Sequence, residues 1–313
     1  MKNSALRPIA VMLVKEVLTT VALLLGVSVV VFTVLSFAPG DPFGTVTVSS
    51  GGTVVSRTGG VKVWQYLSWM GQLLQGDLGH SIRSGLPVLT EVIRTSIYTL
   101  YLTLGAMALS LLLAVPIAVY TAKRGSTDIP GWGITILAYI LSALPAFWFG
   151  YIVIYIAIHG FDFFPLAAGG NAGHWNWFYF LLPVVVLGLC SCGLSEMVRY
   201  LREELRRVLA RDYIRTARAK GASIWRHAFK EGFLLPITEM TAAKVPFILG
   251  GAVVVEQIFN WPGMGRLAWQ AAQDRDYPLI MGITLMAAVF VRLGSLLKQV
   301  IHIIVNPRAS HIT

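Results

Sequence analysis

The sequence predicts an all-α integral membrane protein with about six transmembrane helices. Its 313 residues are 56% hydrophobic and only 13% charged, whereas a soluble domain carries about 25% charged residues. Six apolar stretches approach or exceed the roughly 18–20 residues that a helix needs to cross a bilayer. They are residues 17–37, 96–122, 132–158, 177–197, 237–259 and 279–304.

The first of these stretches has some features of a secretion signal. Lys2, Arg7 and Lys15 precede it, and Ser36-Phe37-Ala38 is similar to a cleavage site. Its apolar run, however, is longer than the 7–15 residues of a signal peptide's apolar region. We therefore expect an uncleaved first transmembrane helix.

The distribution of Lys and Arg predicts the orientation in the membrane. Ten of the 25 basic residues lie between positions 199 and 230, and loops rich in Lys and Arg face the cytoplasm. With six spans, both termini then lie in the cytoplasm. The predicted parts are a cytoplasmic N-terminus (1–16), a first span (17–37), an extracytoplasmic loop region (38–95), a membrane-spanning core (96–304) with a cytoplasmic loop (201–234), and a cytoplasmic tail (305–313).

The net charge of +10 does not indicate nucleic-acid binding. The basic residues gather at predicted cytoplasmic membrane edges, where anionic lipid and the positive-inside rule account for them. Membrane lipid is thus an expected partner, and nucleic acid is not. Cys190 and Cys192 are two residues apart on one predicted helix and so point to different sides, which favours neither a disulfide nor a metal site.

The cytoplasmic loop contains two predicted helices. The stretch 201–211, LREELRRVLAR, has an apolar stripe at helical spacing. Asp212 is a candidate N-cap for a second, short helix, and Gly221 can end that helix in a left-handed conformation. The second helix combines small side chains, which allow close approach, with Arg and Lys that can pair with carboxylates. It is either a docking helix or an ordinary positive-inside loop.

Several segments then favour the docking interpretation. DYIRTARAKGAS (212–223), followed by LLP (234–236), resembles the coupling loop of ABC importer permeases of the dipeptide/oligopeptide/nickel branch. Further segments match this family in order along nearly the whole chain. They are LSFAPGDPF (35–43), QGDLGHSIRSGLPV (75–88), LPAFWFG (144–150), GGAVVVEQIFNWPGMGRL (250–267), DRDYPLIMG (274–282) and NPR (306–308).

This resemblance implies a type I ABC importer permease fold in the cell inner membrane. It implies a transport subunit rather than an enzyme, working with two ATP-binding subunits, an extracytoplasmic substrate-binding protein and a sister permease as a heterodimer. ATP and Mg would belong to the ATP-binding subunits, and this chain has no G-x-x-x-x-G-K-[ST] phosphate loop of its own. No cofactor is expected here. The implied coupling residues are Arg215, Thr216, Ala217, Arg218, Ala219, Lys220 and Gly221, and we expect added bulk to be most harmful at Thr216, Ala217 and Gly221.

Charged residues at membrane depth are costly and suggest function. At 1.5 Å per residue, Lys244 lies about 12 Å into the fifth span and Arg292 about 21 Å into the sixth, entered from outside. We hypothesise that both line an inner vestibule and meet a substrate carboxylate, or pair with Glu196 or Glu239 as a gate. Snorkelling of both side chains to the cytoplasmic interface is the alternative.

A turn follows the fifth span. Glu256 is expected to reach the outer interface beside NWPGMGR. Trp261, Pro262, Gly263 and Gly265 would form a rigid turn with a bulky ring, suited to an extracytoplasmic gate or a receptor-docking surface. The alternative is an ordinary Pro-Gly turn.

The sequence also bears on the transported cargo and on other classes of membrane protein. Within the importer class, peptides are favoured over nickel or another small solute, because His80, His159 and His174 are scattered without metal-ligand spacing. An ATP-independent channel or carrier is the alternative from another class, but no internal repeat of the kind common in carriers is visible. An intramembrane hydrolase is disfavoured because the spans lack Ser/His, Asp/Asp and H-E-x-x-H arrangements.

Overall fold

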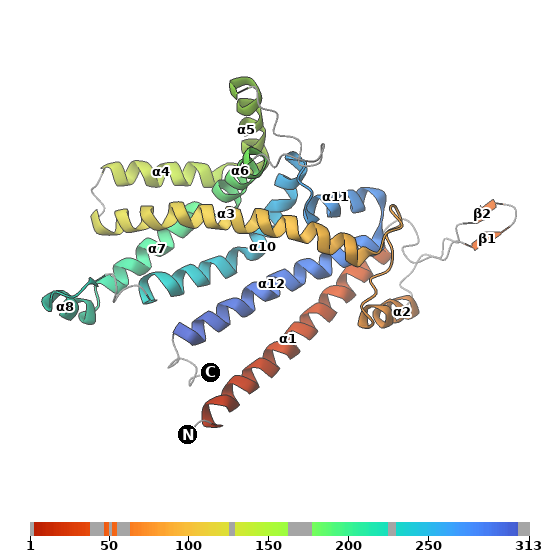
Figure 1. Cartoon of the computed structure of the whole chain (residues 1–313), viewed down its shortest axis with the longest axis horizontal. Helices are drawn as coiled ribbons and strands as arrows, with labels where there is room; N and C mark the ends of the chain where they lie inside the picture. Colours follow the sequence, from red (N-terminus) through yellow and green to blue (C-terminus); the bar gives the residue numbers. More distant parts are fainter. Residues whose placement is uncertain are drawn as a thin grey trace. The chain divides into compact units, whose positions relative to one another are not determined.

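The structure, a computed structural model, describes residues 3–37, 47–49, 52–54, 63–124, 129–161, 177–224 and 230–305. Within these residues the chain is almost entirely helical, as predicted, with one pair of short strands (Figure 1). It divides into two compact units, each described here by itself. The first comprises residues 1–97 and 267–292, and the second residues 98–266 and 293–313.

The first unit combines an N-terminal segment of the chain with a segment near its C-terminus. Its elements are α1 (Asn3–Ser36), β1 (Thr47–Ser49), β2 (Gly52–Val54), α2 (Val63–Leu74), the start of α3 (Val88–Arg124), the end of α11 (Met264–Asp274) and most of α12 (Tyr277–Val305). The two strands pair antiparallel, with Thr47 opposite Val54. The predicted extracytoplasmic loop region thus contains secondary structure of its own, and α3 begins inside it, at Val88.

The second unit holds the middle of the chain. Its elements are the rest of α3, α4 (Ile129–Ala143), α5 (Ala146–Phe161), α6 (Trp177–Val186), the π-helix η1 (Leu187–Ser191), α7 (Leu194–Leu209), α8 (Asp212–Ala219), the π-helix η2 (Lys230–Leu234), α10 (Leu235–Ile258), the start of α11 and the end of α12. One apolar core joins α3, α5, α6, η1 and α10 around Leu102, Leu187 and Phe259. A second joins α3, α4 and α7 around Ala118, Ala138 and Leu201.

The predicted third span, 132–158, is broken rather than continuous. Helices α4 and α5 meet at an angle of 102° across Leu144 and Pro145. A residue before proline is disfavoured in the helical conformation, and proline has no N–H to continue the helix. The apolar composition that predicted the span carries no information about this break.

The predicted fourth span, 177–197, also bends. The α6–η1 segment and α7 differ in direction by 59°. Gly193, which precedes α7, has φ +65°, a left-handed conformation that glycine adopts readily. Gly188 lies against α3 so closely that an added Cβ would be 2.9 Å from the carbonyl oxygen of Ala106.

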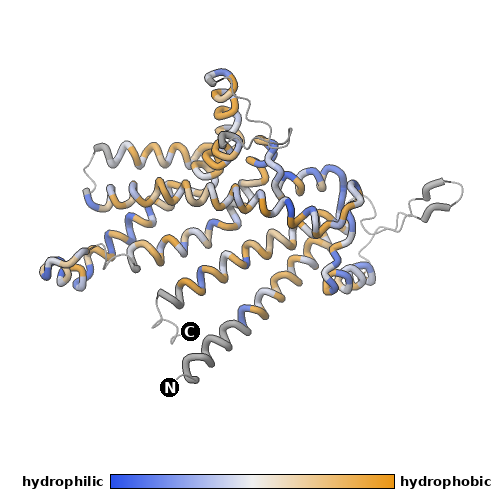
Figure 2. Tube along the Cα trace, viewed as in Figure 1, coloured by the Kyte–Doolittle hydropathy of each residue, from blue (hydrophilic) through white to orange (hydrophobic). Residues whose placement is uncertain are grey.

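Three described helices are long and apolar enough to cross a membrane, and up to five spans result if each bent pair counts as one. The three are Lys15–Ser36 of α1, Val88–Lys123 of α3 and Tyr277–Ile301 of α12. The coloured parts of these spans are mainly hydrophobic in Figure 2. Helix α10 is not among these three, and its first half carries Thr238, Glu239, Thr241 and Lys244. The chain is therefore a multi-pass helical membrane protein, and the count of six spans stays a prediction.

Candidate functional site

The short helix α8 is held on the end of α7 by its apolar side. Ile214 is completely buried and Ala217 is 5% exposed, and Ile214 packs with Val208 of α7. Only two residues separate the helices: α7 ends at Leu209, Arg211 is extended, and α8 begins at Asp212. Asp212 is therefore the first residue of the helix, not its N-cap as the sequence suggested. Arg211 occupies the cap position, and its side chain makes no capping hydrogen bond to the start of α8.

The opposite side of α8 is exposed and combines small and basic residues. Thr216 and Ala219 lie outward, with Arg215 and Lys220 beside them, and all four are exposed. Gly221 ends the helix with φ +69°, which confirms the left-handed C-terminus predicted from the sequence. Ala217 faces α7, so bulk at this position would disturb packing within the chain. The coupling role of Ala217 stays a prediction.

Lys244 of α10 forms an ion pair with Glu196 of α7, one of the pairings predicted from the sequence. The Lys244 side chain is 15% exposed, whereas that of Glu196 is 57% exposed. Gly193 makes room for the lysine, because a Cβ there would be 2.9 Å from Lys244 Nζ. Glu239 accepts a hydrogen bond of 2.8 Å from the hydroxyl of Tyr200. Two carboxylates and a lysine thus lie where α7 and α10 approach each other.

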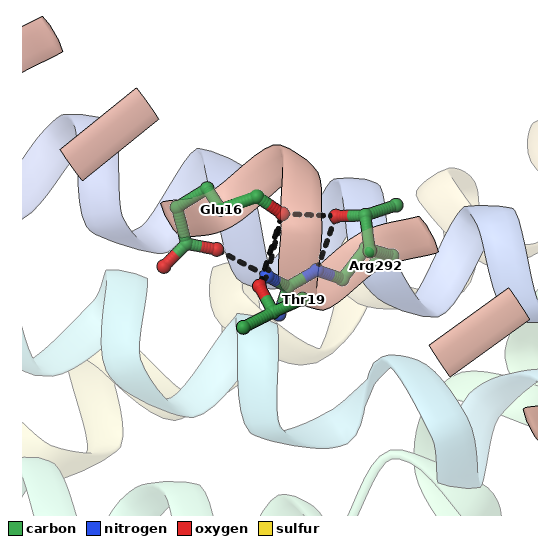
Figure 3. Close-up of polar contacts among 4 residues, drawn as sticks. Glu16, Thr19 and Arg292 are labelled. Carbon is green, nitrogen blue, oxygen red and sulfur yellow. Dashed lines mark hydrogen bonds and ion pairs between the residues drawn. The ribbon is translucent and has the colours of Figure 1, made fainter. Parts of the chain in front are cut away.

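Arg292 has different partners from those predicted. Its guanidinium donates to the carboxylate and the carbonyl oxygen of Glu16 and to the hydroxyls of Thr19 and Thr20, all on α1 (Figure 3). Neither Glu196 nor Glu239 is its partner in this group of contacts. The sequence suggested a vestibule position from depth alone. The first helix provides the carboxylate of Glu16, which the reasoning from depth left out.

Glu256 lies under the turn that follows α10, as predicted. Its side chain is fully buried. The carboxylate accepts a hydrogen bond of 2.7 Å from Thr99 Oγ1 and one of 2.9 Å from the amide of Arg266. A Cβ on Gly263 would collide with this carboxylate, and one on Gly265 would be 2.7 Å from the Cα of Val253. Both glycines are therefore required for the turn to close over Glu256.

The ring of Trp261 does not face outward. It is 2% exposed, belongs to the apolar core of the second unit, and donates 3.1 Å to the carbonyl oxygen of Tyr98. Pro262 is only half-buried. The turn therefore uses Trp261 as an internal anchor, and any docking surface is formed by other atoms of the turn.

A further polar cluster was not singled out from the sequence, although both of its segments were quoted for the family resemblance. Asp276, which is 1% exposed, caps α12 by accepting from the amide of Leu279 and also accepts 2.5 Å from Ser81 Oγ. The backbone amide of Arg83 donates a hydrogen bond to Asp276, and its guanidinium donates one to Asp274. An Asp three residues before a helical amide is a recognisable cap signal, but its contact with position 81 is not visible in the sequence.

Among the described residues, no group of three or more His, Cys, Asp or Glu side chains is arranged to hold a metal ion. His174 lies outside the described residues. Cys190 and Cys192 are both buried and unbridged.

These features define the class: a multi-pass helical membrane protein with an amphipathic helix exposed between two of its membrane helices. Residues 114–311 match the family described as "Binding-protein-dependent transport system inner membrane component". The chain belongs to this family, in agreement with the resemblance found in its sequence. It is a permease component and not itself an enzyme.

Similar proteins cover nearly the whole chain. The oligopeptide transport system permease protein AppB of Bacillus subtilis (strain 168) is 36% identical over 319 residues, which cover 96% of this chain and 100% of that protein. The dipeptide transport system permease protein DppB of Escherichia coli (strain K12) is 32% identical, with 92% and 95% covered. The glutathione transport system permease protein GsiC of Salmonella typhimurium (strain LT2) is 31% identical, with 94% and 96% covered.

Proposed function

We propose that this chain is the membrane-spanning subunit of an ATP-driven importer for dipeptides and oligopeptides. Support comes from the permease family and from the names of three relatives that cover more than nine-tenths of the chain. Those names give an oligopeptide, a dipeptide and glutathione as the transported substrates. All three are peptides, so the shared chemistry of the cargo is an amide backbone with charged ends.

The proposed topology has six spans in a type I importer arrangement, with both termini in the cytoplasm. In this topology α4 with α5 and α6 with α7 each make one bent span, and α10 is the sixth helix that completes the count. Charged side chains such as Glu239 and Lys244 are tolerated in a membrane helix where they face protein or line a polar path. The basic segment 199–230 then lies in the cytoplasm, consistent with the positive-inside rule.

The observation that carries the coupling proposal is the orientation of α8. Ile214 and Ala217 attach the helix to α7 and leave Thr216, Ala219, Arg215 and Lys220 exposed. In the proposal this exposed side enters a cleft of an ATP-binding subunit, with small residues at the contact and cations facing carboxylates. Because α8 follows α7 after an extended Arg211, a movement of α8 is transmitted to α7 and to the bent span.

The remaining partners follow from the same proposal. Two ATP-binding subunits hold ATP and Mg, an extracytoplasmic binding protein delivers the peptide, and a sister permease completes the pore as a heterodimer. This chain binds no cofactor. The Lys244–Glu196 pair and Glu239 act at an inner gate, and the turn over Glu256 acts at the extracytoplasmic end. Arg292, whose guanidinium is bound to Glu16 of α1, is not assigned to this gate.

The test uses the transporter purified from its native membrane. Ala219→Trp places bulk on the exposed side of α8, and Glu203→Trp places the same ring at an exposed position of α7. We expect an ATP-binding subunit to copurify with the unmodified chain and the Glu203 variant, and to be lost from the Ala219 variant. Mass spectrometry of the copurified binding protein, followed by uptake of a labelled tripeptide, then tests the substrate class. Equal recovery of the ATP-binding subunit with both variants would contradict the role of α8.

A further inference from the structure

Helix α2 packs on α1 through one apolar side. Trp69 is 5% exposed, the hydroxyls of Tyr66 and Ser28 are 2.9 Å apart, and the rings of Tyr66 and Phe32 meet edge to face at 5.1 Å. Ser28 and Phe32 belong to α1, one of the three long apolar helices. Helix α2 is therefore fixed against a membrane-spanning helix by its Tyr66 and Trp69 side.

A second apolar side of α2 is exposed. Val63 is 62% exposed, Trp64 82%, Leu67 49% and Leu74 82%. At 3.6 residues per turn these four side chains fall within an arc of about 100°, which is the width of an apolar stripe. On a soluble surface this face would cost free energy in proportion to its exposed area. It calls for an apolar environment.

The third side of α2 is polar and uncharged. Gln65, Ser68 and Gln72 lie together on it, and the whole helix 63–74 contains no Asp, Glu, Lys or Arg. Contacts with water-soluble partners normally include charged and polar rim residues. An uncharged helix with an exposed Trp is instead typical of the boundary between lipid hydrocarbon and headgroups.

The depth of the attachment agrees with this environment. The α1 span ends at Ser36. Phe32 and Ser28 lie four and eight residues before it, or about 6 and 12 Å along the helix. Helices that lie in the membrane interface bury their apolar side about 5–10 Å below the headgroups. Phe32 is thus at the depth expected for such a helix, and Ser28 lies slightly deeper.

We infer that α2 is an interfacial helix whose exposed face, Val63, Trp64, Leu67 and Leu74, rests in the lipid leaflet at the C-terminal end of α1. The same stretch of α1 that carries Ser28 and Phe32 also exposes Val29, Val30 and Val34, as expected for a helix in contact with lipid. The Gln65, Ser68 and Gln72 side faces water. In the proposed topology this is the outer leaflet. Helix α2 then fixes its part of the extracytoplasmic loop region to the membrane surface.

The test measures the environment of two adjacent positions in the complete transporter, reconstituted in phosphatidylcholine/phosphatidylglycerol nanodiscs. Leu67→Cys carries a nitroxide on the exposed apolar face, and Ser68→Cys carries the same label on the polar face. Cys190 and Cys192 are buried, so the unmodified protein gives the background labelling. We expect the ratio of oxygen to nickel-chelate collision rates to be severalfold higher at position 67 than at position 68.

Two results would overturn the inference. One is equal access of the nickel chelate to both positions, which means that the face is in water. The other is protection of position 67 from both oxygen and nickel, which means that protein covers it. A second pair of variants, Leu67→Glu and Ser68→Glu, tests whether the apolar face holds α2 in the lipid. In both variants the nitroxide label is carried by Trp64→Cys. We expect Leu67→Glu to move this label into water and Ser68→Glu to leave it in lipid.

Discussion

Arg292 of α12 is bound to Glu16 of α1, and the two side chains are only 15% and 14% exposed. The hydroxyls of Thr19 and Thr20 complete the donor–acceptor set around the guanidinium. A charge at membrane depth is costly unless it is paired and hydrogen-bonded. This cluster therefore attaches the first membrane helix to the last one, at a cost in desolvation that only the complete set of partners offsets.

The first prediction concerns this attachment. Arg292→Met leaves Glu16 without its cation, and breaking a buried pair from one side typically costs about 3–5 kcal/mol. We expect a lower melting temperature of the nanodisc-reconstituted transporter. Glu16→Gln keeps an acceptor oxygen and should cost less. The double variant Glu16→Leu/Arg292→Met should recover part of the loss, because no unpaired charge remains. Unchanged melting of Arg292→Met would refute the attachment role.

The second prediction compares two neighbouring aspartates. Asp276→Ala removes the cap of α12 and the contacts with Ser81 and the Arg83 amide. Losing the cap alone costs about 0.5–2 kcal/mol. Asp274→Ala removes only an ion pair whose side chains are 63% and 36% exposed, and surface pairs contribute about 0–1 kcal/mol. The melting temperature of Asp276→Ala should be well below that of Asp274→Ala, and the reverse order would contradict the assigned contacts.

The third prediction tests the turn over Glu256. Gly265→Ala brings a Cβ to 2.7 Å from the backbone of Val253, whereas Gly250, earlier on α10, has nothing within 4 Å of an added Cβ. Overpacking of this kind costs about 1–3 kcal/mol. Alanine at a free helical position is favourable by about 0.5–1 kcal/mol. Melting curves should therefore show Gly265→Ala destabilised and Gly250→Ala unchanged or stabilised. Equal effects would mean that the turn can move away from α10.

The sequence predicted the features that depend on local pattern. The apolar stripe of 201–209 is buried in the structure as Leu201, Leu205 and Val208, and Gly221 ends α8 in the left-handed region. Helix periodicity and glycine conformation are properties of short segments, so they can be inferred without knowing the fold. For the same reason the position of Glu256 beside NWPGMGR, which begins four residues further on, was predictable.

Long-range relationships were predicted less well. Glu16 and Arg292 are 276 residues apart, and Ser81 and Asp276 are 195 apart. Depth along a span restricts partners to one level of the membrane but not to one helix, so several carboxylates satisfied the estimate for Arg292. The bends at Pro145 and Gly193 were missed because a hydropathy window averages over the one residue that breaks the helix. The burial of Ala217 was not foreseen, because it depends on neighbours outside the short helix.

The last prediction concerns the Lys244–Glu196 pair. Glu196 is 57% exposed, so the pair contributes little to stability, within about 1 kcal/mol. If it acts at the inner gate, Lys244→Met should lower uptake of a labelled tripeptide severalfold while the melting temperature stays nearly constant. Arg199→Met, which neutralises another exposed position of α7, is the control and should transport normally. The exchanged pair Lys244→Glu/Glu196→Lys should restore part of the uptake, because the attraction is kept with its direction reversed. Normal uptake by Lys244→Met would remove the pair from the gate and leave it a contact between α7 and α10.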